Sequence, residues 1–140
     1  MKVQVKRLSE TAKIPVFAHD DDAGMDLFAS EENTLKVGER GQIKTGIALA
    51  IPLGYVGLIW DKSGISHKHG VKVLGGVIDA GYRGEILVGM INLSDTAHTF
   101  HIGDKITQIL IQKVEHPEIF EVTELDVTAR GESGFGSTGK

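Results

Sequence analysis

The sequence predicts an all-β fold of the jelly-roll or Greek-key type, built as a sandwich or distorted barrel with at most one short helix. Three observations predict it. Runs rich in Val, Ile and Leu recur between turn residues at intervals of roughly eight to twelve residues, which suits antiparallel strands with short connections. Glycine is abundant at 18 residues while proline numbers only 3, which indicates many tight turns. Helical periodicity is scarce, and no alternation of strands and helices indicates a Rossmann sheet.

The expected strands follow these apolar runs along the chain. They cover residues 3–5, 42–51, 56–60, 71–78, 85–93, 98–102, 106–114 and 119–122. Residues 44–51 could also form a short helix, but Gly46 inside the run and Pro52 after it favour a strand. One or two helical turns are expected after Ser63.

The length of 140 residues predicts one domain over residues 1–129, followed by a flexible glycine-rich tail over residues 130–140. The sequence has neither a long apolar run nor the apolar centre of a secretory signal. We therefore expect no membrane span, no export and a cytoplasmic location. The absence of cysteine excludes disulfides, thiolate metal sites and a cysteine nucleophile.

The charge balance limits the possible ligands. The chain has 15 Lys and Arg against 19 Asp and Glu, a formal net charge of −4. Binding to duplex nucleic acid depends on neutralising many phosphates, so nucleic acid is not expected as a partner. A small anion held by a few local cations remains compatible with this composition.

The tail contains two phosphate-binding patterns that fail in context. Residues 134–139 match G-x-G-x-x-G, and residues 134–140 match the start of a P-loop. Both motifs need a helix directly after the glycines, and the sequence reaches Lys140 first. The tail fits either a solvated terminus or a strip that closes over a ligand. In the second case Arg130 binds phosphate, Phe135 stacks on a flat ring, and the strip contributes Gly136, Ser137 and Thr138.

Five ordered segments carry a family likeness. They are residues 23–27 (AGMDL), 61–65 (DKSGI), 76–84 (GVIDAGYRG), 103–108 (GDKITQ) and the tail. Across nearly its whole length the chain resembles the homotrimeric dUTP pyrophosphatases (dUTPases). The resemblance implies a jelly-roll subunit, a homotrimer with three sites at subunit interfaces, and Mg²⁺. It also implies hydrolysis of dUTP to dUMP and pyrophosphate, which limits uracil in DNA and supplies dUMP for dTMP synthesis.

The resemblance assigns catalysis to Asp79 in the third segment. In the family this carboxylate orients the water that attacks the α-phosphorus. An aspartate is a weak base, so we expect it to position and polarise the water, with proton acceptance coupled to attack. Taken alone, Asp79 could equally be an ordinary turn residue.

The same hairpin is implied to hold the nucleoside. The Tyr82 ring would form a wall against deoxyribose and exclude a 2′-hydroxyl. Uracil would be read by backbone groups near Gly76, Val77 and Ile78. These groups pair with uracil but would leave buried polar groups of cytosine unpaired, which costs about 1 to 3 kcal/mol each.

The second and fourth segments match phosphate-binding positions of the family. Ser63 would bind through its hydroxyl and Gly64 through its backbone N–H at a helix start, and Gln108 matches a third such position. Lys62 stands where the family most often has arginine, which keeps the charge but loses the planar fork. Asp104 is expected to structure a turn.

Magnesium is expected to have no direct protein ligand, because a triphosphate and water supply the oxygens it prefers. Asp26 would support the metal and phosphate region, with Arg83 as its expected partner. The acidic run 20–22 is expected to be a solvated loop. The pair His67 and His69 lacks a third ligand at a recognisable spacing, which favours a surface loop.

Two alternatives remain beside dUTP hydrolysis. dCTP deaminases share the fold, but their catalytic glutamate ten positions after Asp79 is here Gly89, and their arginine four positions after Ser63 is here His67. The other alternative is a non-catalytic or moonlighting regulatory trimer. The presence of Asp79, Tyr82, Arg130 and Phe135 together weighs against lost turnover, and the sequence identifies no protein partner.

Overall fold

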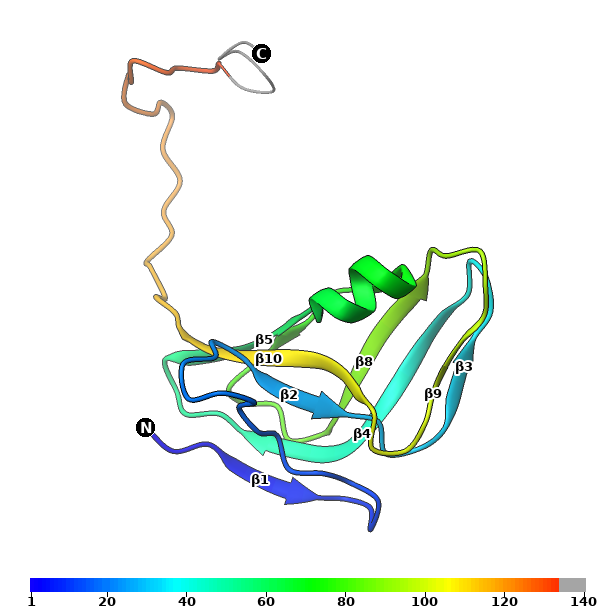
Figure 1. Cartoon of the computed structure of the whole chain (residues 1–140). Helices are drawn as coiled ribbons and strands as arrows, with labels where there is room; N and C mark the ends of the chain where they lie inside the picture. The colour runs from blue at the N-terminus through cyan, green and yellow to red at the C-terminus, as the bar shows by residue number, and fades with distance from the viewer. Residues whose placement is uncertain (134–140) are drawn as a thin grey trace.

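A computed structural model describes residues 1–133 of the chain (Figure 1). The predicted tail residues Phe135, Gly136, Ser137 and Thr138 lie outside the described residues. Within residues 1–133, no helix has the length and apolar character needed to cross a bilayer.

The described chain is built almost entirely of strands, as predicted. In chain order the elements are β1 (Gln4–Arg7), β2 (Met25–Phe28), β3 (Asn33–Leu35), β4 (Arg40–Ala50), β5 (Tyr55–Trp60), η1 (Gly64–Lys68), β6 (Val71–Val73), β7 (Val77–Ile78), β8 (Glu85–Asn92), β9 (His98–Phe100) and β10 (Lys105–Lys113). The short helical segment expected after Ser63 is η1, a single π-helical turn.

The strands form three antiparallel sheets. One has the order β1-β4-β8-β6, the second has the order β2-β10-β5-β7, and β3 pairs with β9. The two larger sheets enclose the core in a jelly-roll arrangement (Figure 1). This confirms the predicted all-β class.

β4 and β8 build much of this core: residues 45–49 of β4 are all buried, whereas β8 alternates. On β8 every second residue is buried, so Ile86, Val88 and Met90 face inward. They pack with apolar residues of the other sheets, including Leu27, Ile43, Ile47, Phe100, Ile106 and Ile109. The length of the apolar runs explains why the long strands were predictable.

A bulge interrupts β4 at Gly46 and shifts its register with β8 between Lys44 and Ala48. Gly46 has a φ of +65°, and a Cβ there would lie 2.5 Å from Ser9 Oγ. The Gly46 N–H donates to Glu85 Oε1 at 2.8 Å, and its carbonyl accepts from Leu8 N at 2.7 Å. The bulge therefore ties β4 to the start of β8 and to the N-terminal segment.

The strand expected over residues 71–78 is divided into β6 and β7. Gly75 and Gly76 lie between them with φ of +70° and +140°. This break lets β6 pair with β8 while β7 pairs with β5 in the other sheet. The sequence prediction missed the break because the apolar run continues through it.

The strand expected over residues 119–122 is wrong. Residues 114–133 contain no helix or strand and extend away from the barrel (Figure 1). Ile119 and Phe120 are 91% and 75% exposed, and no strand of the described chain lies beside them to pair with their backbone. The short strands β2 and β3 were missing from the predicted set, because three or four residues show little alternation.

Candidate active site

The turn after β5, together with η1, forms one wall of a recess of about 390 Å³. Its lining residues are Asp61, Ser63, Ser66, His67, Lys72 and Gln108. We call it the phosphate-side recess. It contains Ser63 and Gln108, two of the predicted phosphate-binding residues, and so brings the second and fourth segments together.

Ser63 and Gly64 stand exposed at the first turn of η1. Ser63 makes no side-chain capping hydrogen bond, so its hydroxyl is available to a ligand. A Cβ on Gly64 would meet no described atom within 4 Å, which means that packing within this chain does not require glycine there. Both observations suit close approach of a ligand to this turn.

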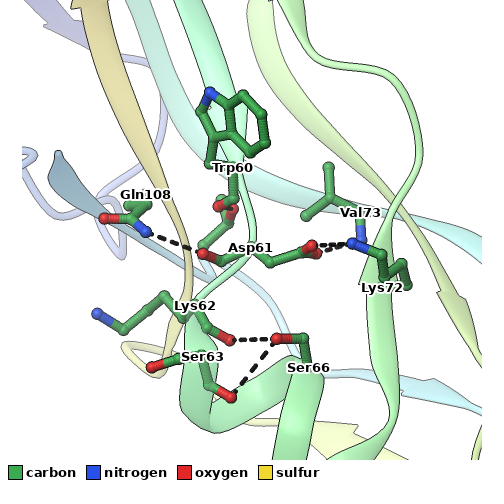
Figure 2. Close-up of polar contacts among 9 residues, drawn as sticks. Trp60, Asp61, Lys62, Ser63, Ser66, Lys72, Val73 and Gln108 are labelled. Atoms are coloured by element: carbon green, nitrogen blue, oxygen red, sulfur yellow. Dashed lines mark hydrogen bonds and ion pairs between the residues drawn. The ribbon is translucent and has the colours of Figure 1, made fainter. Parts of the chain in front are cut away.

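Asp61 fixes this turn to two neighbouring strands, as Figure 2 shows. Its Oδ1 accepts from the Val73 N–H at 2.8 Å, and its Oδ2 pairs with the Lys72 ammonium. Its backbone carbonyl accepts from Gln108 Nε2 at 2.9 Å. Asp61 thereby links the phosphate-side recess to both β6 and β10.

A buried ion cluster lies beside this turn. The Asp26 carboxylate, with its side chain 4% exposed, pairs with Lys62 through Oδ1 and with Lys105 through Oδ2, the latter at 2.7 Å. Burial alone would raise the pKa of Asp26, but hydrogen bonds and positive charge from Lys105 and Lys62 outweigh it and hold the pKa below its usual range. The carboxylate is therefore ionised at neutral pH.

Asp26 and Arg83 do not pair within the described chain. The Arg83 guanidinium donates through Nη1 to the carbonyls of Ala80 at 2.6 Å and Tyr82 at 2.7 Å. It closes its own turn, because two nearby carbonyls satisfy it locally. Asp26 instead pairs with lysines brought next to β2 by β10 and by the turn after β5.

A second recess, of about 250 Å³, lies on the hairpin after β7. Its lining residues are Gln42, Val77, Ile78, Asp79, Tyr82, Glu85 and Leu87, and we call it the hairpin recess. The Tyr82 N–H donates to the Asp79 carbonyl at 3.0 Å, so both residues share one turn, as predicted. Asp79 and Tyr82 are exposed on the single chain.

The two recesses have no lining residue in common. A third recess, of about 320 Å³, borders both, since it shares Asp61 and Lys72 with the phosphate-side recess and Val77 with the hairpin recess. Asp79 and Tyr82 line only the hairpin recess. Arg130 lies on the extended segment and lines neither recess; its Nε donates to the Ser133 carbonyl at 2.9 Å.

Comparison with known proteins decides the family. The family model for dUTPase matches residues 10–139, which is most of the chain. The chain belongs to the dUTPase family.

Relatives of this dUTPase agree in sequence and in fold. The deoxyuridine 5′-triphosphate nucleotidohydrolase of Thermobifida fusca is 45% identical, and the alignment covers 99% of this chain and 79% of the relative. The Staphylococcus bacteriophage 80alpha dUTPase G164S mutant with dUpNHpp superposes with a TM-score of 0.95 at 33% identity, over 99% of each chain. The D95N mutant dUTPase of S. aureus phage phi11, which coordinates a structural Mg(II) ion, has a TM-score of 0.86 at 31% identity over 91% of this chain and 100% of that one. The chain is therefore a dUTP-hydrolysing enzyme.

Sequence reasoning missed three residues at the dUTPase site: Asp61, Lys72 and Lys105. Each acts through a partner distant in sequence, such as Asp61 with Val73 or Lys105 with Asp26. Asp61 and Lys105 lie inside family segments, whereas Lys72 lies in none of them. Charge at these positions gave no indication of the partner.

Proposed function

We propose that Asp79 orients the attacking water in the hydrolysis of dUTP to dUMP and pyrophosphate. The observation that carries this is the shared turn: the Asp79 carboxylate and the Tyr82 ring line one recess. A nucleoside held against Tyr82 would direct its innermost phosphate toward that carboxylate. Positioning a nucleophile is the main task in phosphoryl chemistry, where the enzyme contributes orientation and charge.

We propose that the edge of β7 reads uracil. β7 is the outermost strand of its sheet and uses one side to pair with β5, through Gly57 with Ile78 and Leu58 with Val77. Its outer backbone groups have no neighbouring strand in the described chain. The Gly76 carbonyl already has a partner within the fold, because it accepts a hydrogen bond from Ile59 N at 2.8 Å. Val77 and Ile78 are therefore the better candidates for base recognition.

We propose that the complete site forms between subunits of a homotrimer. The composition of the hairpin recess supports this, because it contains none of the phosphate-side residues and a triphosphate bound there could take them from another copy. The extended segment supports it too: Ile119, Phe120, Leu125 and Val127 are 75% to 98% exposed, which suits burial against a second subunit. The predicted closing of the tail over the site remains part of this proposal.

We propose that Mg²⁺ enters with the triphosphate. Among residues 1–133 no group of three or more His, Asp or Glu side chains is placed to hold an ion, so phosphate oxygens and water suit the ligand set. When bound, the ion would neutralise phosphate charge. Asp26 and its lysine partners border the same region and would set the charge around it. The cytoplasmic location stays a prediction from the sequence.

The test is the substitution Asp79→Asn. We expect binding of dUpNHpp, measured by calorimetry, to stay within about tenfold, while pyrophosphate release from dUTP falls at least about a hundredfold, since the carboxylate acts mainly in the transition state. Asp95→Asn is the matched control, because Asp95 is an exposed aspartate that lines neither recess. An equal loss of binding and turnover would contradict the assignment.

The same assay series separates the alternatives. Pyrophosphate release should be specific for dUTP over dCTP, dTTP and UTP in the presence of magnesium. Release of ammonia from dCTP would indicate deaminase activity. Binding of dUpNHpp by the unmodified protein without any pyrophosphate release from dUTP would favour the non-catalytic regulator.

A further inference from the structure

The Tyr82 ring lies directly against Gly84. A Cβ built on Gly84 would be 2.3 Å from Tyr82 Oη, 2.5 Å from Cζ and 2.9 Å from Cε2. No side chain fits at residue 84 while the tyrosine holds this position. Gly84 thus provides the space that the ring occupies.

The backbone at Gly84 does not itself demand glycine. Its φ lies outside the left-handed region that glycine adopts at Gly75 and Gly76. At Gly81, in the same turn, a Cβ would meet nothing within 4 Å. What excludes a methyl group at residue 84 is therefore the tyrosine ring.

A hydrogen bond also fixes the position of the Tyr82 ring. Tyr82 Oη donates to the Glu85 carbonyl at 2.9 Å. Glu85 is itself anchored, because its Oε1 accepts from the Gly46 N–H at the β4 bulge. The acceptor is thus attached to the barrel, and the ring is placed between a fixed hydrogen bond and an open glycine.

We infer that Gly84 is a positioning residue that sets the selectivity of the enzyme for deoxyribose over ribose, acting through Tyr82. The inference rests on the proposed role of Tyr82 as the wall of the sugar site. A methyl group at residue 84 must displace something, and the end of the tyrosine ring moves more easily than the anchored backbone. The hydroxyl then leaves the Glu85 carbonyl, and the wall no longer stands where a 2′-hydroxyl would clash.

The experiment measures kcat/KM for dUTP and for UTP with the full chain and magnesium. We expect Gly84→Ala to lower the dUTP-to-UTP ratio of kcat/KM at least tenfold. Gly81→Ala is the matched control, the same substitution in the same turn without the clash, and its ratio should stay within twofold of the unmodified protein. Tyr82→Ala should lower the ratio by at least as much as Gly84→Ala.

A double variant tests whether Gly84 acts through the ring. In the Tyr82→Ala background, Gly84→Ala should leave the ratio and the melting temperature unchanged, because the clashing atoms are gone. A purely structural role for Gly84 would persist in that background. If Gly84→Ala alone does not fold, a folded double variant still supports the inference, and an unfolded double variant overturns it.

The outcomes distinguish the inference about Gly84 from the proposal that Tyr82 forms the wall of the sugar site. If Tyr82→Ala lowers the ratio but Gly84→Ala does not, the inference about Gly84 is wrong and the tyrosine wall stands. If Tyr82→Ala leaves the ratio unchanged, the tyrosine is not the sugar wall, and both statements are wrong.

Discussion

Asp26 is a nearly buried carboxylate held between two ammonium groups. Removing one partner of such a cluster leaves charge without compensation in a poorly solvated place. The Lys62 ammonium is paired with the Asp26 carboxylate in this structure. A phosphate contact by Lys62 would therefore have to share or replace that ion pair. The contact expected between Lys62 and phosphate stays a prediction.

The lowered pKa of Asp26 predicts a pH-dependent contribution to stability. The folded pKa lies below the unfolded one, so the stabilisation is complete above about pH 4 and is lost as pH falls through the folded pKa. We expect Asp26→Asn to lower the melting temperature by about 5 °C at pH 7. The deficit should shrink as pH falls below about 4, because the unfolded carboxyl then binds a proton that the native carboxylate does not, and the advantage of the native ion pairs is lost towards the folded pKa.

Thermal unfolding at pH 3 and pH 7 checks this expectation. Asp95→Asn provides the comparison, since Asp95 is exposed and in no ion pair of the described chain. A deficit of the same size at pH 3 and pH 7 would mean that the lost ion pairs are not its cause.

For single residues, the sequence pointed to candidate site residues but not to the side chains with which they pair. Asp79, Tyr82, Ser63 and Gln108 stand in contiguous, chemically distinctive segments, and their roles stay predictions. The partner of Asp26 was not recognisable, since charge pairing depends on which strands become neighbours. The turn role expected for Asp104 is confirmed, because its Oδ2 accepts from His101 N at 2.8 Å within a local turn.

At the scale of elements, the break between β6 and β7 positions the proposed base-binding edge. Gly76 lies against β5, where an added Cβ would be 2.7 Å from Ile59 Cβ and 2.9 Å from the Ile59 carbonyl oxygen. The neighbouring Gly75 also has a positive φ, but a Cβ there meets no described atom within 4 Å. A substitution at Gly75 would therefore introduce backbone strain alone, whereas one at Gly76 would introduce both backbone strain and steric overlap with β5.

Substituting each glycine by alanine should give different losses. We expect Gly75→Ala to cost about 1 kcal/mol, from the unfavourable φ alone. Gly76→Ala should cost about 3 kcal/mol, because overlap with β5 adds to the strain. Urea unfolding measures both values. Equal costs would show that β7 can move away from β5 without penalty.

Long elements were predictable and short ones were not. β4, β8 and β10 are long apolar runs bounded by turn residues, and their predicted ranges agree with the structure to within two residues at each end. β7 has only two residues, and its assignment to a sheet depends on the glycines before it. Whether such a short segment forms a strand depends on the strand it pairs with in the fold, and the local sequence pattern does not reveal that partner.

At the scale of the whole molecule, the barrel ends at β10 and a long segment leaves it. The Val114 N–H donates to the Gly54 carbonyl at 2.9 Å, and beyond this point the segment extends away from the barrel (Figure 1). The predicted boundary at residue 129 between domain and tail stays a prediction. The exposed apolar residues of this segment are the ones that the proposed homotrimer would bury.

Two truncations separate the contributions of this segment. Deleting residues 133–140 should abolish most dUTP turnover and leave the melting temperature and the trimer unchanged, since the tail would act on the ligand alone. Deleting residues 115–140 should also weaken the trimer, because Ile119, Phe120 and Leu125 are lost. Light scattering and thermal unfolding distinguish the two. Loss of the trimer in the shorter deletion would make the tail structural.

The separation of the hairpin recess from the phosphate-side recess has a genetic consequence. If each catalytic centre borrows one recess from each of two neighbours, a defect in one recess does not disable every centre of a mixed assembly. Two inactive alleles, one altered at Asp79 and the other at Ser63, can then complement each other within one cell. Two alleles altered in the same recess cannot, so the pattern of complementation would map which residues meet across the interface.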